Sequence, residues 1–449
     1  MKNLFKEVPG SIIAPRGFLA SGVFCNIKRL GTGKGSNKGQ KRDLALIVSE
    51  VPATVAGMFT TNQVCAAPVK VCAERVKQGV AQALVINSGN ANACTGKQGL
   101  ADAREMTAVL AKQFHMPEPH VLVGSTGRIG VTMPMANVKR GILEAVQILG
   151  NAPAQADEAC EAIMTSDTRP KQIAVEFKLG GKTVRIGGIC KGAGMIQPGM
   201  SATGARPAAL PGDRPQGLHA TMLCFITTDA AIDAKVLQAS LNEAVAHSFN
   251  RITVDGDMST NDTVLVLANG LAGNKNIQHS TFNIQRRTFQ AALNHVCLEL
   301  AKKIVREGEG VHRVVTVRVN GAKTIQDADA AARAVANSAL VKTSWHGGDP
   351  NWGRIIDALG YSPATVVEEK VDIGYSAAGS RQILWSLKRG QPTKATFKAL
   401  CAAVAPKEFD LHIRLNVGNA SALMYAADLT EEYVDFNKGD VSDPGSLGG

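Results

Sequence analysis

The amino-acid sequence predicts a mixed fold of the α/β (α+β) class. Short apolar runs bounded by Gly, Asn or Asp, such as residues 44–48 and 222–226, are typical of buried strands. Residues 100–114 and 138–149 instead carry apolar side chains at helical spacing. With 449 residues, 45% of them apolar and 19% charged, the chain can bury a large core, as two or three lobes or as one α/β body.

Composition argues against several classes of protein. Aromatic residues make up only 4% of the chain, so a stacking surface for nucleic acid is not expected despite a formal charge of +11. No apolar stretch is long enough to cross a membrane, and residues 1–18 lack the apolar core of a secretory signal. The nine cysteines show neither a C-x-x-C pair nor zinc-type spacing. We therefore expect reduced thiols, no metal, no nucleic-acid or membrane partner and a cytoplasmic location.

Taken in order, the chain alternates strands, helices and loops rich in glycine and asparagine. Gly180-Gly181 separates two strand-like runs, which predicts a hairpin over residues 173–189. Further strands are expected at 44–48, 82–86, 121–123, 222–229, 264–267, 314–319, 366–373 and 410–417, and helices at 100–114, 138–149, 157–164, 234–249, 280–305, 327–341 and 394–404. Residues 87–96, 254–263 and 346–353 are predicted to be structured loops, the second built from Asx-type turns rather than a cation site.

Three positions next to glycines have side chains suited to acyl chemistry. Ser125-Thr126-Gly127 follows a strand, and a Thr before a Gly lets a hydroxyl and a backbone N–H point at one spot, as an oxyanion requires. Lys191, after the hairpin, is suited to anchoring a carboxylate, and Glu309 between two glycines to holding an amine or relaying a proton. From the residues alone, an ordinary turn is favoured for Thr126, and most loop glutamates have neither of those roles. A solvated loop position is at least as well supported for Lys191.

The junction between Ala220 and Thr221 precedes the apolar run 222–226 and follows a Gly/Pro-rich stretch without periodicity, which predicts a loop or linker. If this peptide bond were cut, Thr221 would have its own α-amine as a base beside its hydroxyl, an activation that threonine nucleophiles use. Taken alone, a buried strand with a Thr at its edge is the favoured interpretation.

Eight motifs in a fixed order closely resemble the ornithine acetyltransferase family, also called glutamate N-acetyltransferase or the arginine-biosynthesis bifunctional protein. The resemblance runs from about residue 8 to residue 442. The motifs are NSGNANACTG (87–96), STG (125–127), MTSDT (164–168), KGAGMI (191–196), ATML (220–223), VDGDMSTNDT (254–263), GEG (308–310) and DPNWGR (349–354).

The resemblance implies a layered α-β-β-α sandwich that cuts itself before Thr221. Residues 1–220 would become the α chain and residues 221–449 the β chain, which usually assemble as a dimer of such pairs. Thr221 would carry the acetyl group from N2-acetylornithine to glutamate in a ping-pong reaction, without a cofactor, and acetyl-CoA stays open as a second acetyl donor. By family pattern, the oxyanion hole is formed by Thr126 and Gly127, and the substrate site by Thr165, Lys191, Thr221, Glu309, Asn437 and Ser442.

Several departures from the family pattern leave alternatives open. Residues 201–219 are an inserted Gly/Pro-rich loop, which makes Thr203 a rival to Thr221 and puts self-cleavage in question. Glu307 competes with Glu309 as the site carboxylate, and residues 443–449 extend beyond the usual end. The alternative functions are a related N-terminal-threonine amidase or aminopeptidase, with water as the acceptor, and an uncleaved homologue without catalysis.

Overall fold

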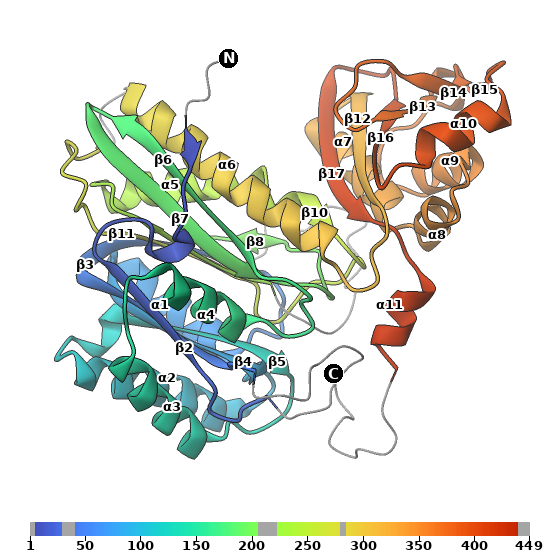
Figure 1. The fold of residues 1–449 in the computed structure, drawn as a ribbon. Coiled ribbons are helices and arrows are strands. Elements are labelled where there is room, and N and C mark those ends of the chain that lie inside the picture. The colour runs from blue at the N-terminus through green and yellow to red at the C-terminus, as the bar shows by residue number, and fades with distance from the viewer. Residues whose placement is uncertain (1–4, 29–40, 205–221, 279–283, 439–449) are drawn as a thin grey trace.

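The computed structural model describes residues 5–28, 41–204, 222–278 and 284–438. They form a mixed α/β structure with two sheets, shown in Figure 1 as a layered body and a C-terminal lobe. The sheet of the layered body contains β1 (Lys6–Glu7), β2 (Phe18–Val23), β3 (Leu44–Thr60), β4 (Val80–Asn90), β5 (Val121–Arg128), β6 (Lys171–Leu179), β7 (Lys182–Lys191), β8 (Met200–Ser201), β9 (Leu223–Thr228) and β11 (Thr263–Ala268).

The long strand β3 joins two halves of this sheet. Its first part, from Leu44 to Ser49, pairs with β2 and β4, and its last part, from Thr54 to Thr60, pairs with β11 and β8. The strand order is β1-β6-β7-β9-β11-β3-β4-β5, with β2 and β8 also pairing with β3. The inner faces of the halves pack together, since Phe225 of β9 lies over Gly124 of β5 and shares one apolar cluster with Leu122 and Val123 of that strand.

Helices cover both outer faces of the folded sheet, which makes the four layers α-β-β-α. On one side α5 (Ala234–Ala246) and α6 (Ile284–Arg306) pack with the outward residues of β9, Cys224 and Ile226. On the other side lie α1 (Ala67–Arg75), α2 (Gly96–Gln113), α3 (Met135–Gln147) and α4 (Pro153–Ile163) (Figure 1). The predicted sandwich is therefore confirmed.

The C-terminal lobe has its own sheet, in the order β10-β17-β12-β16-β13-β14-β15. Its strands are β10 (Ile252–Thr253), β12 (Val314–Ala322), β13 (Asp372–Ala377), β14 (Leu384–Lys388), β15 (Gln391–Pro392), β16 (Glu408–Arg414) and β17 (Ala420–Ala427). Its helices are α7 (Ile325–Asn337), α8 (Ala339–Gly347), α9 (Trp352–Gly360) and α10 (Phe397–Val404), and α11 (Glu431–Phe436) follows it. A separate apolar cluster around Val317, Phe409 and Ile413 forms its core.

The predicted elements were mostly correct in type, and the differences have local causes. The hairpin forms as expected, with Gly180 and Gly181 at φ of 57° and 83°, values that a type I′ turn requires. The single helix predicted at 327–341 is wrong, because α7 ends at Asn337 and Ser338 caps α8 by accepting a hydrogen bond from the Val341 N–H. The strand predicted at 366–373 is also misplaced, since it begins at Asp372 after a 3-10 turn.

Two further findings concern expectations from composition. No described helix has both the length and the apolar character needed to cross a membrane. All nine cysteines are unpaired, as expected for reduced thiols. Ser280, where the helix predicted at 280–305 begins, lies outside the described residues.

Candidate active site

Thr126 and Gly127 lie in strand β5 rather than in a turn after it. The strand predicted to end at residue 123 continues to Arg128 because it stays paired with β4, with Thr126 opposite Ser88. The neighbouring Ser125 hydroxyl donates to Asn87 Oδ1 at 2.7 Å. For the same reason, the predicted loop at residues 87–96 is partly wrong, because β4 runs through Asn90 and α2 begins at Gly96.

Gly127 is a position that only glycine fits. Its φ is 127°, a conformation that side chains rarely adopt, and a Cβ there would lie 2.4 Å from the carbonyl carbon of Gly89. The absence of a side chain therefore lets β5 approach β4 closely at its carboxyl end. This end of the strand is where the predicted oxyanion residues lie.

Lys191 connects the two halves of the sheet. It is the last residue of β7 and pairs with Leu223 at the start of β9, so the predicted loop position is wrong. Its side chain is almost completely buried, and Nζ donates to Thr126 Oγ1 across the sandwich at 3.2 Å. Burial lowers the pKa of Lys191, while the nearby carboxylates of Asp167, Glu309 and Asp262 oppose that shift.

Asp167 organises the residues around Lys191. Its carboxylate accepts hydrogen bonds from the amides of Gly192, at 2.8 Å, and Thr165, at 3.0 Å. It also binds Lys171 Nζ at 2.7 Å and lies 4.0 Å from Lys191 Nζ. Burial alone would raise the pKa of Asp167, but the two ammonium groups and the hydrogen bonds hold it well below its usual range.

Glu309 lies in this cluster, whereas Glu307 points elsewhere. The Glu309 carboxylate receives hydrogen bonds from Ser166 and from Asn437 Nδ2, the latter at 3.3 Å, and it fills the space beside Gly194. Burial raises the pKa of Glu309, and these hydrogen bonds and the charge of Lys191 partly offset that shift. Glu307 instead faces Thr168 and Arg169, at 3.3 Å and 3.9 Å. Of the two rivals, only Glu309 joins the other predicted site residues.

The segment 254–263 forms the predicted Asx-type turns and also links the layers. Asp255 Oδ1 accepts the amides of Ile196, at 2.8 Å, and Asp257, at 3.2 Å. Asn261 Nδ2 donates to the carbonyls of Ala91 and Ser125, which ties this segment to the end of β5. Within the described residues, no group of three or more His, Cys, Asp or Glu side chains is placed to hold a metal ion.

Asp262 lies beside the start of β9. It is buried, and its Oδ1 accepts the amide of Met222, the residue after Thr221, at 3.0 Å, whereas Oδ2 has no hydrogen-bond partner among the described residues. Burial raises the pKa of Asp262 to about 7. Thr221, Ala220 and Ser442 themselves lie outside the described residues, while the rival Thr203 is exposed beyond β8.

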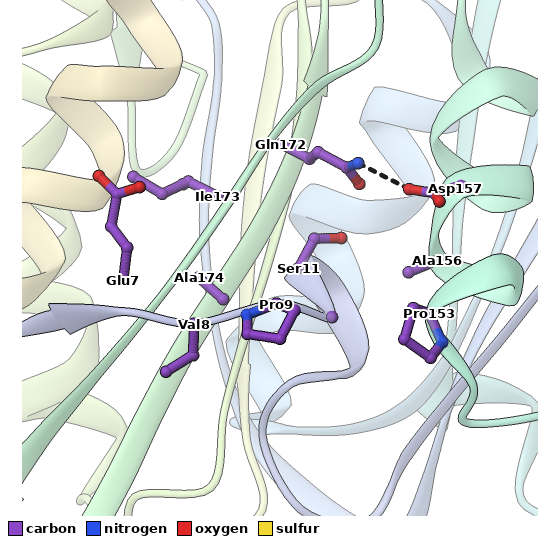
Figure 2. Close-up of a pocket in the computed structure, with 11 residues that line it drawn as sticks. Glu7, Val8, Pro9, Ser11, Pro153, Ala156, Asp157, Gln172, Ile173 and Ala174 are labelled. Carbon is purple, nitrogen blue, oxygen red and sulfur yellow. Dashed lines mark hydrogen bonds between the residues drawn. The ribbon is translucent and has the colours of Figure 1, made fainter.

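A pocket of about 220 Å³ lies elsewhere, between the start of the chain, α4 and β6. Figure 2 shows Ser11, Gln172 and Asp157 around it, with Gln172 Nε2 donating to Asp157 at 2.7 Å. The predicted site residues do not line this pocket. The candidate active site is the polar cluster at the strand ends, where Lys191 contacts Thr126 and Glu309 lies close by.

Comparison with known proteins identifies the family of this chain. The model of the ArgJ family matches residues 27–439. The chain belongs to the ArgJ family. The arginine biosynthesis bifunctional protein ArgJ of Symbiobacterium thermophilum is 45% identical over 428 residues, which cover 95% of this chain and 98% of the relative. The glutamate N-acetyltransferase of Methanocaldococcus jannaschii is 42% identical over 437 residues, covering 96% of this chain and 98% of the relative.

One solved structure is ornithine acetyltransferase complexed with ornithine, from Mycobacterium tuberculosis. It is 35% identical, covers 44% of this chain and 100% of its own, and has a TM-score of 0.39. The family inferred from the eight motifs is thus confirmed, as is the prediction of an acyltransferase enzyme.

The sequence analysis missed several residues of the polar cluster at the strand ends. Asp167 and Ser166 lay within a quoted motif without an assigned role, and Asp262 and Asn261 were interpreted only as turn residues. Lys171 was not assigned a role, although it lies at the same alternating positions of its strand as Ile173, Val175, Phe177 and Leu179, and a lysine in such an apolar series is a usable signal for a buried charge. Their partners lie many positions away in the sequence, so spacing alone did not identify them.

Proposed function

We propose that this protein is an N-acetyltransferase of arginine biosynthesis that moves the acetyl group of N2-acetylornithine to glutamate. Ornithine is released and N-acetylglutamate is formed. Its membership of the ArgJ family and the names of its relatives support this activity. The observation that carries the proposal is the contact of Lys191 with Thr126, beside Glu309, because a cation, a hydroxyl and a carboxylate meet there at the ends of buried strands.

The reaction proceeds through an acetylated Thr221. The Thr221 oxygen attacks the acetyl carbonyl, and its hydroxyl proton passes through the α-amine to the departing amine as the C–N bond breaks. Thr126 and Gly127 stabilise the oxyanion. The α-amine of glutamate then attacks the acetyl ester and regenerates the hydroxyl. One amide replaces another, so no cofactor is required, and acetyl-CoA would be an additional acetyl donor.

The substrate side chains are held by the remaining predicted residues. The contacts of Thr165 and Lys191 with the Asp167 carboxylate support their assignment to the substrate site. The hydrogen bond from Asn437 to Glu309, whose charge acts on Lys191, supports the assignment of that pair. Ser442 completes the set by family pattern. The buried surroundings of Lys191 exclude water, which protects an acetyl-enzyme from hydrolysis.

Maturation occurs by cleavage between Ala220 and Thr221, and the fragments stay together as a dimer of αβ pairs. Pairing in the sheet supports the association of the fragments. Strand β9, which follows Thr221, is hydrogen-bonded to β7 of the first fragment, and β11 is hydrogen-bonded to β3. Separating the fragments would expose these strands and the apolar face between the layers.

Denaturing mass spectrometry and an acetyl-transfer assay test this proposal. Wild-type protein should give two fragments, with Thr221 as a new N-terminus, and should transfer labelled acetyl from N2-acetylornithine to glutamate faster than it releases acetate. Thr221→Ala should remain one chain and lose turnover by at least about three orders of magnitude.

Thr203→Ala is the matched control, since Thr203 also follows an alanine but is not followed in the sequence by an apolar run like residues 222–226. It should be cleaved and active like the wild type. An intact wild-type chain would contradict self-cleavage, and release of acetate without transfer would indicate an amidase instead. If Thr203→Ala stayed uncleaved while Thr221→Ala was still cleaved, Thr203 would be the nucleophile.

A further inference from the structure

Three charged side chains are buried together between the layers at the ends of β6 and β7. Lys171 and Lys191 are each 1% exposed, and Asp167 is 4% exposed. The carboxylates of Glu309 and Asp262 also act on Lys191. Buried charges are costly unless paired, so such a cluster is expected to serve a purpose beyond folding.

The two lysines are not equivalent partners of Asp167. Lys171 Nζ lies 2.7 Å from Oδ1, within hydrogen-bond distance, whereas Lys191 Nζ lies 4.0 Å from Oδ2. The amides of Gly192 and Thr165 occupy further acceptor positions of the same carboxylate. Asp167 is therefore largely satisfied by Lys171 and by backbone, and Lys191 lies closer to Thr126 Oγ1, at 3.2 Å, than to Asp167.

The contact with Lys191 constrains the Thr126 hydroxyl. An ammonium group can only donate, so the Thr126 oxygen must be the acceptor in this bond. The single hydroxyl hydrogen of Thr126 is then directed away from Lys191, toward another acceptor. Because a charged donor also polarises the hydroxyl, Thr126 becomes a better donor to an oxyanion than an isolated threonine.

We propose that Lys191 acts in the acyl-transfer step by orienting and polarising the Thr126 hydroxyl, and that Lys171 is a positioning residue that neutralises Asp167 and so keeps Lys191 directed at Thr126. This inference rests on the proposed function, in which Thr126 serves the oxyanion. This role of Lys191 is separate from the substrate-holding role proposed above, because a loss of substrate binding would raise KM, whereas a misdirected Thr126 hydroxyl would lower kcat. Glu309 and Asp262 are the other charged groups that act on Lys191.

Replacing Lys171 distinguishes a role of Lys191 in orienting Thr126 from a role in binding the substrate. In Lys171→Met, Asp167 loses its nearest cation and attracts Lys191 away from Thr126. We expect kcat for acetyl transfer to fall roughly tenfold, a part of the loss caused by removing an oxyanion donor, while KM changes less than about twofold. Lys171→Arg should recover most of the activity, because it restores the charge.

A double-mutant cycle shows whether the effect passes through Thr126. In a Thr126→Ala background, Lys171→Met should lower kcat by less than about twofold further, since the contact it supports is already absent. Lys342→Met is the matched control: Lys342 is also a buried lysine, in the C-terminal lobe, and bonds the Ala427 carbonyl. It should retain the wild-type kcat in protein that remains folded by circular dichroism.

A second variant covers the case in which Lys171→Met does not fold. Asp167→Asn combined with Lys171→Met removes both charges of the pair and leaves the charge of Lys191 at Thr126, and its kcat should lie within about fivefold of wild type. An increase in KM at unchanged kcat, or full additivity with Thr126→Ala, would overturn the inference. Its failure differs from failure of the proposed function, in which the wild-type protein itself transfers no acetyl group.

Discussion

The layered body and the C-terminal lobe both pack helices on a sheet, but they treat buried charge differently. In the layered body, Asp167, Lys171 and Lys191 meet within 4.0 Å at the ends of two strands, with Asp262 and Glu309 near Lys191. In the lobe, buried charges are met by backbone groups and by partly exposed side chains: Asp410 binds the partly exposed Arg318 at 2.8 Å and accepts the Gly379 amide at 3.1 Å, and Lys342 bonds the Ala427 carbonyl.

This difference indicates that the buried charges of the layered body lower the stability of the fold. A buried cluster of charges is weak support for folding, because desolvation offsets most of the attraction. The same cluster supplies strong electrostatics where water is excluded. The layered body thus has its buried charges at the proposed active site, while the lobe has an apolar core around Val317, Phe409 and Ile413.

The largest expected effect is on stability, in Asp167→Asn. This change leaves Lys171 buried without its ion-pair partner and takes one carboxylate away from Lys191, so it should lower the free energy of unfolding by about 3–5 kcal/mol. Asp410→Asn in the lobe should cost about 1 kcal/mol, since Arg318 can turn to water. Urea unfolding of the two variants measures both values. Equal losses would remove the distinction between the two regions.

The next effect is on catalysis, in Thr126→Val. Loss of an oxyanion donor should lower kcat by roughly 10²–10³-fold. The control is Thr228→Val at the opposite end of β9, where the buried hydroxyl donates to the Arg185 carbonyl at 2.7 Å, and kcat should stay near wild type. Steady-state acetyl transfer from N2-acetylornithine is the measurement. A similar loss in both variants would point to general damage to the sandwich.

A smaller effect separates the two glutamates. Glu309→Gln should lower kcat/KM about tenfold or more, because it removes the carboxylate that faces Lys191 and Asn437. Glu307→Gln should change it less than about twofold, since that side chain faces Thr168 and Arg169. Both proteins can be compared in one transfer assay. The reverse order of effects would make Glu307 the site carboxylate.

The smallest effect is a pH dependence of stability that comes from Asp262. Burial raises its pKa to about 7, so between about pH 4 and 7 the folded protein holds a proton that the unfolded chain releases. This group therefore favours folding less as pH rises through that window. Asp262→Asn should show a smaller decrease in melting temperature than wild type between pH 5 and 7.5, measured by calorimetry. An identical decrease would show that Asp262 is charged throughout.

Much of the fold could be predicted because it depends on local chemistry. Gly180-Gly181 fixes the turn of one hairpin, and the apolar spacing of residues 100–114 sets most of α2. The errors arose where partners distant in the sequence decided the outcome. Strand β5 extends through Thr126 because β4 pairs with it, and the helix predicted at 327–341 divides at Ser338, whose cap hydrogen bond was not recognised.

The sequence by itself determined the family, through eight motifs in a fixed order, and the types of most elements. It also identified Thr126, Lys191 and Glu309 as residues suited to acyl chemistry. Only the tertiary structure decided that Lys191 reaches Thr126, 65 positions away, that Asp167 is bound mainly by Lys171, and that Glu309 rather than Glu307 joins them. The physical reason is that turns and helices form from neighbours in the chain, whereas these contacts exist only after two layers pack and exclude water.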